Sequence, residues 1–290
     1  MKRGKVYVQF PRTGLGNMLL VWSRAFVFSR LNGLPLVTTS WGRIQWGAWL
    51  RWERKKRAYW GYFREDGWWR RWSTAFEKKR LAVVTEPEVK PWPGTDETIF
   101  LFDQVSPEKD LFGPFRAHRD MVKEGILDLL SPRMRAALDT YAPPVIAIHI
   151  RRGDFKYGNP LTPTLFFIEA IRLTREAAGE QWPVTVFTDA APGEIGDVLA
   201  LPGVRLAEDK PDILDILLMS RSRVLVLSRS STFSYWGAFL SDAIIIKPEG
   251  DWQDDLRPME INHRIFEGKV DFDDPASVRR LEEGFKVLRN

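Results

Sequence analysis

The chain has 290 residues, and 44% of them are hydrophobic, so it can bury a sizeable core and is long enough for two domains. It contains no cysteine and only three histidines, which excludes a disulfide framework, a cysteine nucleophile and a thiolate metal site. The apolar stretch near the N-terminus is interrupted at Gln9 and Pro11, too early for a signal peptide, and no run has the length of a transmembrane helix. We therefore expect a cytoplasmic protein without a metal centre.

The first half of the chain opens with a predicted strand–helix–strand unit. Its first turn, residues 11–17, contains Gly14 and Gly16, which permit a tight backbone and the close approach of a ligand. A lone G-x-G is a weak signal, and Asn17 follows it directly. The predicted elements are strand 5–10, helix 17–32, strand 36–39, strand 98–102, helices over 119–138 broken at Ser131-Pro132, and a linker at 139–144.

A Trp-rich basic segment lies at residues 41–80 and carries eight of the thirteen tryptophans. It also holds twelve basic and four acidic residues, a net charge of +8, although the whole chain has only +5. Interleaved indoles and cations suit a membrane interface, a sugar acceptor or single-stranded nucleic acid. The alternative is a helical insertion that packs its indoles onto the first domain and leaves its arginines in solvent. The sequence leaves both interpretations open.

The second half alternates strands and helices, which predicts a parallel, doubly wound sheet. The C-terminal helix should be capped by Asp274, with Pro275 in its first turn, and should serve packing. The predicted elements are strands 145–150, 184–187, 224–228 and 243–247, separated by helices 165–178, 213–220 and 233–241 and followed by the capped helix.

The most informative motif is His149-Ile150-Arg151-Arg152-Gly153-Asp154, which directly follows an apolar strand. Strand ends are where α/β folds place ligands, and a guanidinium matches phosphate oxygens two at a time. Alternation along the strand puts His149 and Arg151 on one face and Arg152 on the other. We expect Arg151 to meet a phosphate-bearing ligand and Arg152 to pair with Asp154.

Three further loops follow strands of this half and should open at the same edge of the sheet. Asp189 is expected either to touch ligand or to cap the next turn. Asp215 stands in an apolar helix start, where it would accept paired bonds from guanine or act as a helix N-terminal charge. Small hydroxyls lead into the next helix and would offer donors to a phosphate, although N-capping explains one of them. This hydroxyl cluster includes Ser230, Ser231 and Thr232.

Four motifs together resemble the α-1,2-fucosyltransferases, within the wider group of GDP-fucose fucosyltransferases. In chain order they are Gly14-Leu15-Gly16-Asn17, the motif His149 to Asp154, Phe187-Thr188-Asp189, and Ser231-Thr232-Phe233-Ser234-Tyr235-Trp236-Gly237-Ala238. The resemblance spans residues 6–247 and implies an α/β fold of the GT-B type, with two Rossmann-like domains facing each other across a cleft. It implies an N-terminal acceptor-side domain over 1–140, a nucleotide-sugar domain over 141–270 and a C-terminal packing helix over 271–290.

The same resemblance implies roles for particular residues. Arg151 corresponds to the arginine on the β-phosphate of GDP-fucose, with His149 beside it at the nucleotide. Asp215 corresponds to an acidic residue at guanine, and Asn17 faces the sugar. Ser231 and Thr232 correspond to the phosphate-contacting loop. Met18 and Ala190 depart from the family pattern, and the Trp-rich basic segment has no counterpart in it.

The implied reaction is a metal-independent, inverting transfer of L-fucose to a glycan or lipid-linked glycan, with an α-1,2 linkage. Asp103 is a candidate base. One alternative is a GT-B enzyme using another nucleotide sugar, and another is a non-catalytic protein that binds lipid or nucleic acid on a Rossmann-like scaffold. With the enzyme interpretation, no nucleic acid is expected, and residues 41–80 would contact either the acceptor or the inner face of a membrane.

Overall fold

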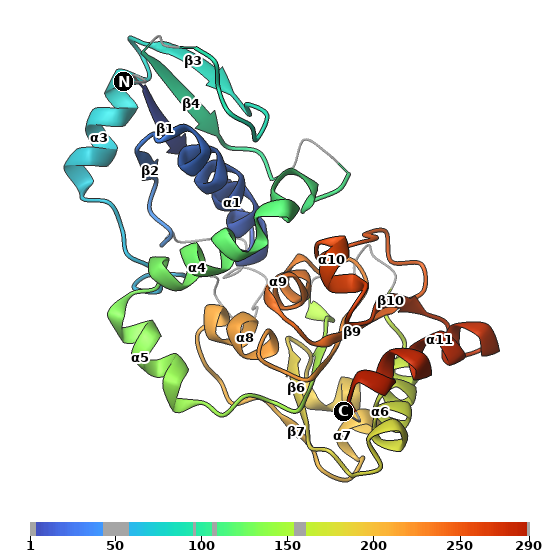
Figure 1. Cartoon of the computed structure of the whole chain (residues 1–290). Coiled ribbons are helices and arrows are strands. Elements are labelled where there is room, and N and C mark those ends of the chain that lie inside the picture. The colour runs from blue at the N-terminus through green and yellow to red at the C-terminus, as the bar shows by residue number, and fades with distance from the viewer. Residues whose placement is uncertain (1–3, 43–57, 95–96, 106–108, 154–160, 289–290) are drawn as a thin grey trace. The chain divides into compact units, whose positions relative to one another are not determined.

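The structure, a computed structural model, describes residues 4–42, 58–94, 97–105, 109–153 and 161–288. The chain divides into two compact units, Met1–Ala137 and Leu138–Asn290, each with its own parallel β-sheet (Figure 1). Among the described residues, no helix is both long and apolar enough to cross a membrane.

The first unit holds a four-stranded parallel sheet in the order β2-β1-β4-β3 within its described part. The sequence TIFLF makes β4 a strand buried along its whole length, as an apolar run beside two neighbours should be. Helix α1 ends at Gly33, whose φ of 63° only glycine adopts easily. The elements are β1 Gly4–Val8, α1 Leu15–Asn32, β2 Leu36–Thr38, α3 Trp68–Glu77, β3 Ala82–Thr85, β4 Thr98–Phe102, the 3₁₀ turn η1 Gly113–His118, α4 Arg119–Leu129 and α5 Pro132–Thr140.

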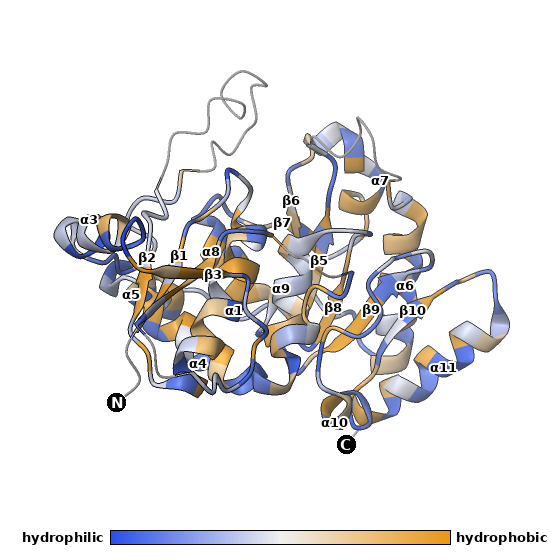
Figure 2. Ribbon diagram, turned by 90° about the horizontal axis from the view of Figure 1, so that it is seen from above, coloured by the Kyte–Doolittle hydropathy of each residue, from blue (hydrophilic) through white to orange (hydrophobic). Residues whose placement is uncertain are grey.

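The second unit is built on a six-stranded parallel sheet in the order β10-β9-β8-β5-β6-β7 within its described part. Short strands alternate with helices, as the hydropathy pattern predicts, and β8 and β9 are hydrophobic in Figure 2. The elements are β5 Ile146–Ile150, α6 Thr164–Ala178, β6 Val184–Thr188, η3 Pro192–Ile195, α7 Gly196–Leu199, β7 Val204–Leu206, α8 Asp212–Met219, β8 Val224–Val226, α9 Thr232–Leu240, β9 Ile244–Pro248, α10 Met259–Asn262, β10 Glu267–Val270, α11 Pro275–Phe285 and η4 Lys286–Leu288.

The strand order of the second unit reverses between β5 and β8. From β5 the chain adds β6 and β7 on one side, and it then crosses back to add β8, β9 and β10 on the other. The register aligns Ile146 with Val224 and Ile148 with Val226, so both strands end at the same edge. In doubly wound sheets, ligands bind at the carboxyl ends of the two strands that flank such a reversal. The fold thus makes the loops after β5 and β8 the leading candidates for a site.

The two faces of this sheet pack against different helices. Ile146, Ile148 and Ile150 of β5 belong to a hydrophobic core with Phe167 of α6 and Leu281 of α11. Helices α8 and α9 pack on each other on the other side of the sheet (Figure 1). Since side chains alternate along a strand, His149 points away from the core shared by α6 and α11.

Several expectations about the elements are confirmed and others are wrong. Asp274 caps α11, because its carboxylate accepts the backbone N–H groups of Ala276 and Ser277 at 3.0 and 3.2 Å. The linker expected at 139–144 is wrong in its first two residues, since α5 continues to Thr140. Strands β3, β7 and β10 were not predicted. Each is three or four residues long and has one sheet neighbour, so its hydropathy pattern is weak.

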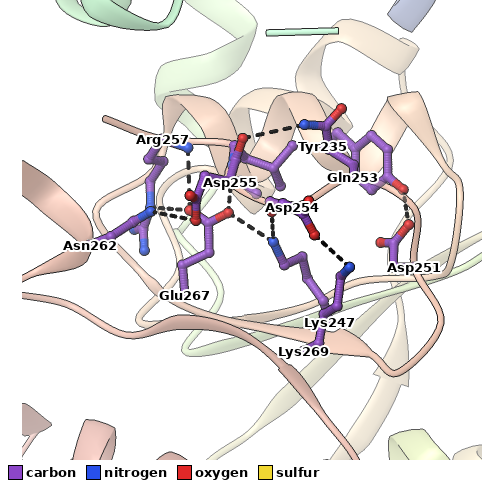
Figure 3. A network of polar contacts seen from close by, with 12 residues as sticks. Tyr235, Lys247, Asp251, Gln253, Asp254, Asp255, Arg257, Asn262, Glu267 and Lys269 are labelled. Atoms are coloured by element: carbon purple, nitrogen blue, oxygen red, sulfur yellow. Dashed lines mark hydrogen bonds and ion pairs between the residues drawn. The ribbon is translucent and has the colours of Figure 1, made fainter. Parts of the chain in front are cut away.

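A buried cluster of charges holds the end of the second sheet together (Figure 3). The Glu267 side chain of β10 is fully buried, and its carboxylate lies 3.1 Å from both Lys247 Nζ and Arg257 Nε. Arg257, which is also fully buried, donates to the carbonyl oxygens of Ala243 and Phe266 at 2.8 and 3.2 Å. These contacts tie the segment after β9 to β10.

Candidate functional site

Ser228 joins the carboxyl ends of β5 and β8. Its buried hydroxyl donates to the carbonyl of His149 at 2.8 Å and accepts the backbone N–H of Arg151 at 2.9 Å. The loop after β8 is therefore fixed to the arginine motif at the point where the strand order reverses. The sequence placed Ser228 only at the end of the predicted strand 224–228, because nothing local reveals a bond across 77 residues.

The two arginines of the motif differ in exposure, as strand alternation predicts. The Arg151 side chain is 23% exposed, and its Nη1 lies 2.8 Å from Asp189 Oδ2. Arg152 is buried and donates its backbone N–H to Asp189 Oδ1 at 2.7 Å. Burial lowers the pKa of Arg152, while the charges of Glu194 and Asp189 act to raise it. The predicted partner Asp154 lies outside the described residues.

Asp189, which follows β6, is the carboxylate that orients the arginine motif. Its Oδ2 would lie 2.3 Å from a Cβ placed on Gly153, whose φ is 22°, so only glycine admits this approach. The alternative that Asp189 caps the next turn is wrong. Instead, Ala190 donates its backbone N–H to Thr188 Oγ1 at 2.9 Å, and Ala191 donates its backbone N–H to the carboxylate of Glu194.

The serine loop after β8 is held in shape by residues that the sequence did not single out. Ser230 has a left-handed φ of 57°, and its N–H donates to Asp251 Oδ1 at 3.3 Å. Tyr235 of α9 donates its hydroxyl to the same oxygen (Figure 3). The backbone N–H of Arg229 donates to Thr162 Oγ1 at 2.9 Å. These contacts pre-form the loop that carries the predicted Ser230, Ser231 and Thr232.

Ser231 stands at the N-terminus of α9 but does not cap it. Its backbone is extended there, and its side chain makes no capping hydrogen bond. The N-capping expected of one serine in this loop is therefore not made by Ser231. His149 lies beside the same helix start, with its ring centroid 5.3 Å from that of Phe233. The structure thus brings His149, the serine loop and the start of α9 together at one edge of the sheet.

Asp215 lies in the first turn of α8 and is nearly buried, with 11% of its side chain exposed. Its Oδ1 is 3.4 Å from Lys210 Nζ, which lies 5.2 and 5.5 Å from the ring centroids of Tyr141 and Phe187. Asp215 therefore lies in the first turn of a helix, as the N-terminal charge interpretation requires, and it also has a cationic partner. Phe187 is the last-but-one residue of β6, so Asp215 lies near a neighbouring strand end.

The two candidates of the first unit lie at the ends of its central strands. Asn17 is in the first turn of α1, and within the described residues its enclosed Oδ1 makes no hydrogen bond. The preceding loop is fixed by Leu15, whose N–H donates to Tyr59 Oη at 2.9 Å. Asp103 follows β4, and its backbone N–H donates to Glu86 Oε1 at 2.7 Å. The carboxylate of Asp103 takes no part in that contact, so the contact gives no support to the hypothesis that Asp103 is the catalytic base.

Asp251 gives this loop a testable pH dependence. Burial raises the pKa of Asp251, although the hydrogen bonds from Tyr235 and Ser230 and the charge of Lys247 oppose the shift. The folded state then holds the proton more tightly than the unfolded state, so Asp251 costs stability as pH rises from about 3.9 through the raised pKa. Asp251→Asn is expected to remove this slope, measured as urea unfolding free energies at several pH values.

The matched control is Asp254→Asn, whose side chain is 84% exposed. It should keep the pH slope of the parent protein, because the buried Asp251 is intact in this variant. A constant difference between Asp251→Asn and the parent protein at all pH values would show that Asp251 does not carry the dependence.

Comparison with known proteins identifies the fold of this chain but no sequence family. No family model and no curated protein matches the chain. Among solved structures, selenomethionine NodZ fucosyltransferase from Bradyrhizobium is similar with a TM-score of 0.50 and 17% identity, over 86% of this chain and 96% of that one. POFUT1 with GDP-fucose has a TM-score of 0.53 and 12% identity over 83% and 94%. POFUT1 with GDP gives 0.52 and 13% over 84% and 96%.

At these identities the likeness establishes the fold class. The chain has the α/β fold of the GT-B type, built from two Rossmann-like units, as the sequence predicts. The solved structures match across both units rather than one.

Proposed function

We propose that this protein is a glycosyltransferase that moves L-fucose from GDP-fucose to a hydroxyl group of a glycan. The observation that carries the proposal is the arrangement of residues at the point where the strand order of the second sheet reverses. There, a partly exposed Arg151 is fixed to the serine loop through Ser228, and this loop leads into the start of α9, which has no side-chain cap. Backbone N–H groups at a helix start and an oriented guanidinium form a site for a diphosphate. The similar structures named as complexes with GDP-fucose and GDP support the choice of nucleotide.

Each residue of this arrangement has a proposed role in binding the donor GDP-fucose. Arg151 binds the β-phosphate, and Asp189 orients its guanidinium. The serine loop and the α9 start bind the phosphates, with His149 against the nucleotide. Asp215 accepts from guanine, with Lys210 holding its carboxylate in place. The phosphate-binding residues of the loop are Ser230, Ser231 and Thr232.

The proposed reaction is one displacement with inversion. An acceptor hydroxyl attacks C1 of fucose, the bond from C1 to the β-phosphate oxygen breaks, and GDP leaves with the bonding electrons while the hydroxyl proton passes to a base. Arg151 neutralises the charge that develops on the departing phosphate. Among the described residues, no three His, Asp or Glu side chains are grouped to hold a metal ion. We propose that the reaction proceeds without one.

The first unit is the proposed acceptor side. Asn17 orients the acceptor hydroxyl through its amide, whose enclosed oxygen has no hydrogen-bond partner among the described residues. The acceptor is a glycan, free or lipid-linked, and the proposed linkage is α-1,2, which rests on the sequence motifs alone. The proposed location is the cytoplasm, peripheral to the inner face of a membrane.

GDP is expected to raise the thermal midpoint of this protein more than UDP or ADP does at the same concentration. The reason is that a ligand stabilises the native state more when it binds more tightly. The Asp215 carboxylate can accept paired bonds from N1 and N2 of guanine, whereas uracil offers it one N–H donor. The shift should be equal in EDTA and in magnesium. The measurement is a thermal-shift series with GDP, UDP, ADP and GDP-fucose.

The same series separates the alternatives. A larger shift with UDP would indicate a GT-B enzyme using another nucleotide sugar, and no shift with any nucleotide would favour a non-catalytic binding protein. Turnover of GDP-fucose that stops in EDTA and returns with magnesium would contradict the metal-independent mechanism.

A further inference from the structure

Helix α3 presents four large aromatic side chains to solvent. Trp68, Trp69 and Trp72 are 68%, 67% and 69% exposed, and Phe76 is 47% exposed. Residues three and four apart share a helix face, and at 100° per residue these four side chains lie within about 100° of the helix circumference. They therefore form one continuous aromatic face, defined here by these four residues.

The aromatic face lies opposite the side of α3 that packs on its own unit. Thr74 is the fully buried residue of this helix, and it is about 190° around the helix from the middle of the aromatic face. An amphipathic helix of a water-soluble domain normally turns its apolar face to the core. Trp41 of the same Trp-rich basic segment does so, with ring centroids 4.1 and 4.2 Å from Phe10 and Phe63. The indoles of α3 are not core residues.

The charges around the aromatic face are predominantly positive. Residues 58–80 include six basic and three acidic residues. Arg70 and Arg71 form ion pairs with the acidic residues that precede α3. Lys78, Lys79 and Arg80 follow the helix consecutively, and the Arg80 guanidinium lies 4.4 Å from the Phe76 ring centroid. This arrangement complements an anionic surface beside an apolar one.

We propose that α3 is an interfacial helix that seats its aromatic face in the headgroup region of an anionic lipid bilayer. Tryptophan concentrates at that depth, because its ring is apolar while its N–H is polar. Helices with tryptophan on one face and cations around it lie in the plane of the interface. A soluble protein partner would leave the row of three cations without a stated role, whereas phosphatidylserine headgroups supply their counter-charges. This inference is independent of the fucosyl-transfer proposal.

The test is co-sedimentation of the full chain with vesicles of phosphatidylcholine alone or with phosphatidylserine. We expect binding to the anionic vesicles that weakens with salt, and a blue shift of tryptophan emission on binding. Trp69→Ala with Trp72→Ala should lower binding at least tenfold. Lys78→Gln and Lys79→Gln should each lower it about fivefold, the factor for one cation at an anionic surface.

The control is Trp252→Ala, an indole in the second unit that is 47% exposed, and it should bind vesicles like the parent protein. The thermal midpoint and the GDP shift of every variant separate this inference from loss of folding and from the nucleotide site. Absent binding to anionic vesicles at low salt, or unchanged binding of the double tryptophan variant, overturns the proposal. A parent dimer that the double tryptophan variant converts to a monomer would identify a second copy as the occupant and would also overturn it.

Discussion

Arg151→Lys is expected to lower kcat for GDP-fucose by about 10²-fold or more while leaving the thermal midpoint nearly unchanged. Arg151 is partly exposed, so its side chain contributes little to packing. Lysine keeps the positive charge but loses the planar fork that binds two oxygens at once, and this geometry matters most when charge develops on the leaving phosphate. Steady-state kinetics and a melting curve check the expectation together.

Two lysine variants serve as controls for this result. Arg152→Lys is expected to act through stability, because Arg152 is buried and donates from Nη1 to the carbonyl of Arg151 at 3.0 Å. Arg205→Lys changes an exposed arginine on edge strand β7 and should alter neither property. If instead Arg152→Lys lowered kcat at an unchanged thermal midpoint and Arg151→Lys lowered the thermal midpoint, the roles assigned to the two arginines would be reversed.

Glu267→Ala is expected to reduce the free energy of unfolding by about 3–5 kcal/mol, the usual cost of removing one partner from a buried ion pair. Its carboxylate faces two buried cations, Lys247 and Arg257, and also accepts the N–H of Leu256 at 2.7 Å. Without it, both buried cations of the cluster in Figure 3 lose the carboxylate that lies 3.1 Å from each of them. Equilibrium denaturation in urea measures the loss.

Glu176→Ala is the matched control, since it breaks an ion pair with Arg172 in which both side chains are more than half exposed. Exposed pairs of this kind contribute about 0.3–0.5 kcal/mol. Glu267→Gln keeps the side-chain shape and removes only the charge, so it separates electrostatics from lost volume. A loss for Glu267→Ala no larger than for Glu176→Ala would show that the cluster is not a major source of stability.

The sequence predicted the central strands and the edge strand β2 but missed the edge strands β3, β7 and β10, for a physical reason. Strands β5, β6, β8 and β9 have neighbours on both sides, so they are apolar runs that hydropathy detects. Edge strand β10, with the sequence EGKV, uses its polar residues in the charged cluster, which masks the strand pattern. The bounds of the helices shifted by one or two residues, as helix ends commonly do.

For the candidate site, the sequence identified residues at strand ends and missed the residues that hold them. Alternation along the strand predicted that Arg151 and Arg152 point to opposite faces, because that pattern is local, and Arg151 is the more exposed of the two. The bond from Arg151 to Ser228 spans 77 residues, and the bond from Arg152 to Asp189 spans 37. Such partners are brought together only by the folded sheet. The sequence also left the role of the Trp-rich basic segment open, because burial is decided by the fold. Trp41 is buried, whereas the indoles of α3 are exposed.

The ion pair between Arg151 and Asp189 has a consequence for how the proposed reaction ends. The guanidinium has an anion of its own chain as partner, 2.8 Å away. In the proposed complex, the diphosphate shares the guanidinium with that carboxylate, whose negative charge repels it. Asp189 then limits how tightly spent nucleotide is retained, so the pair favours rapid exchange of product for fresh donor over maximal affinity.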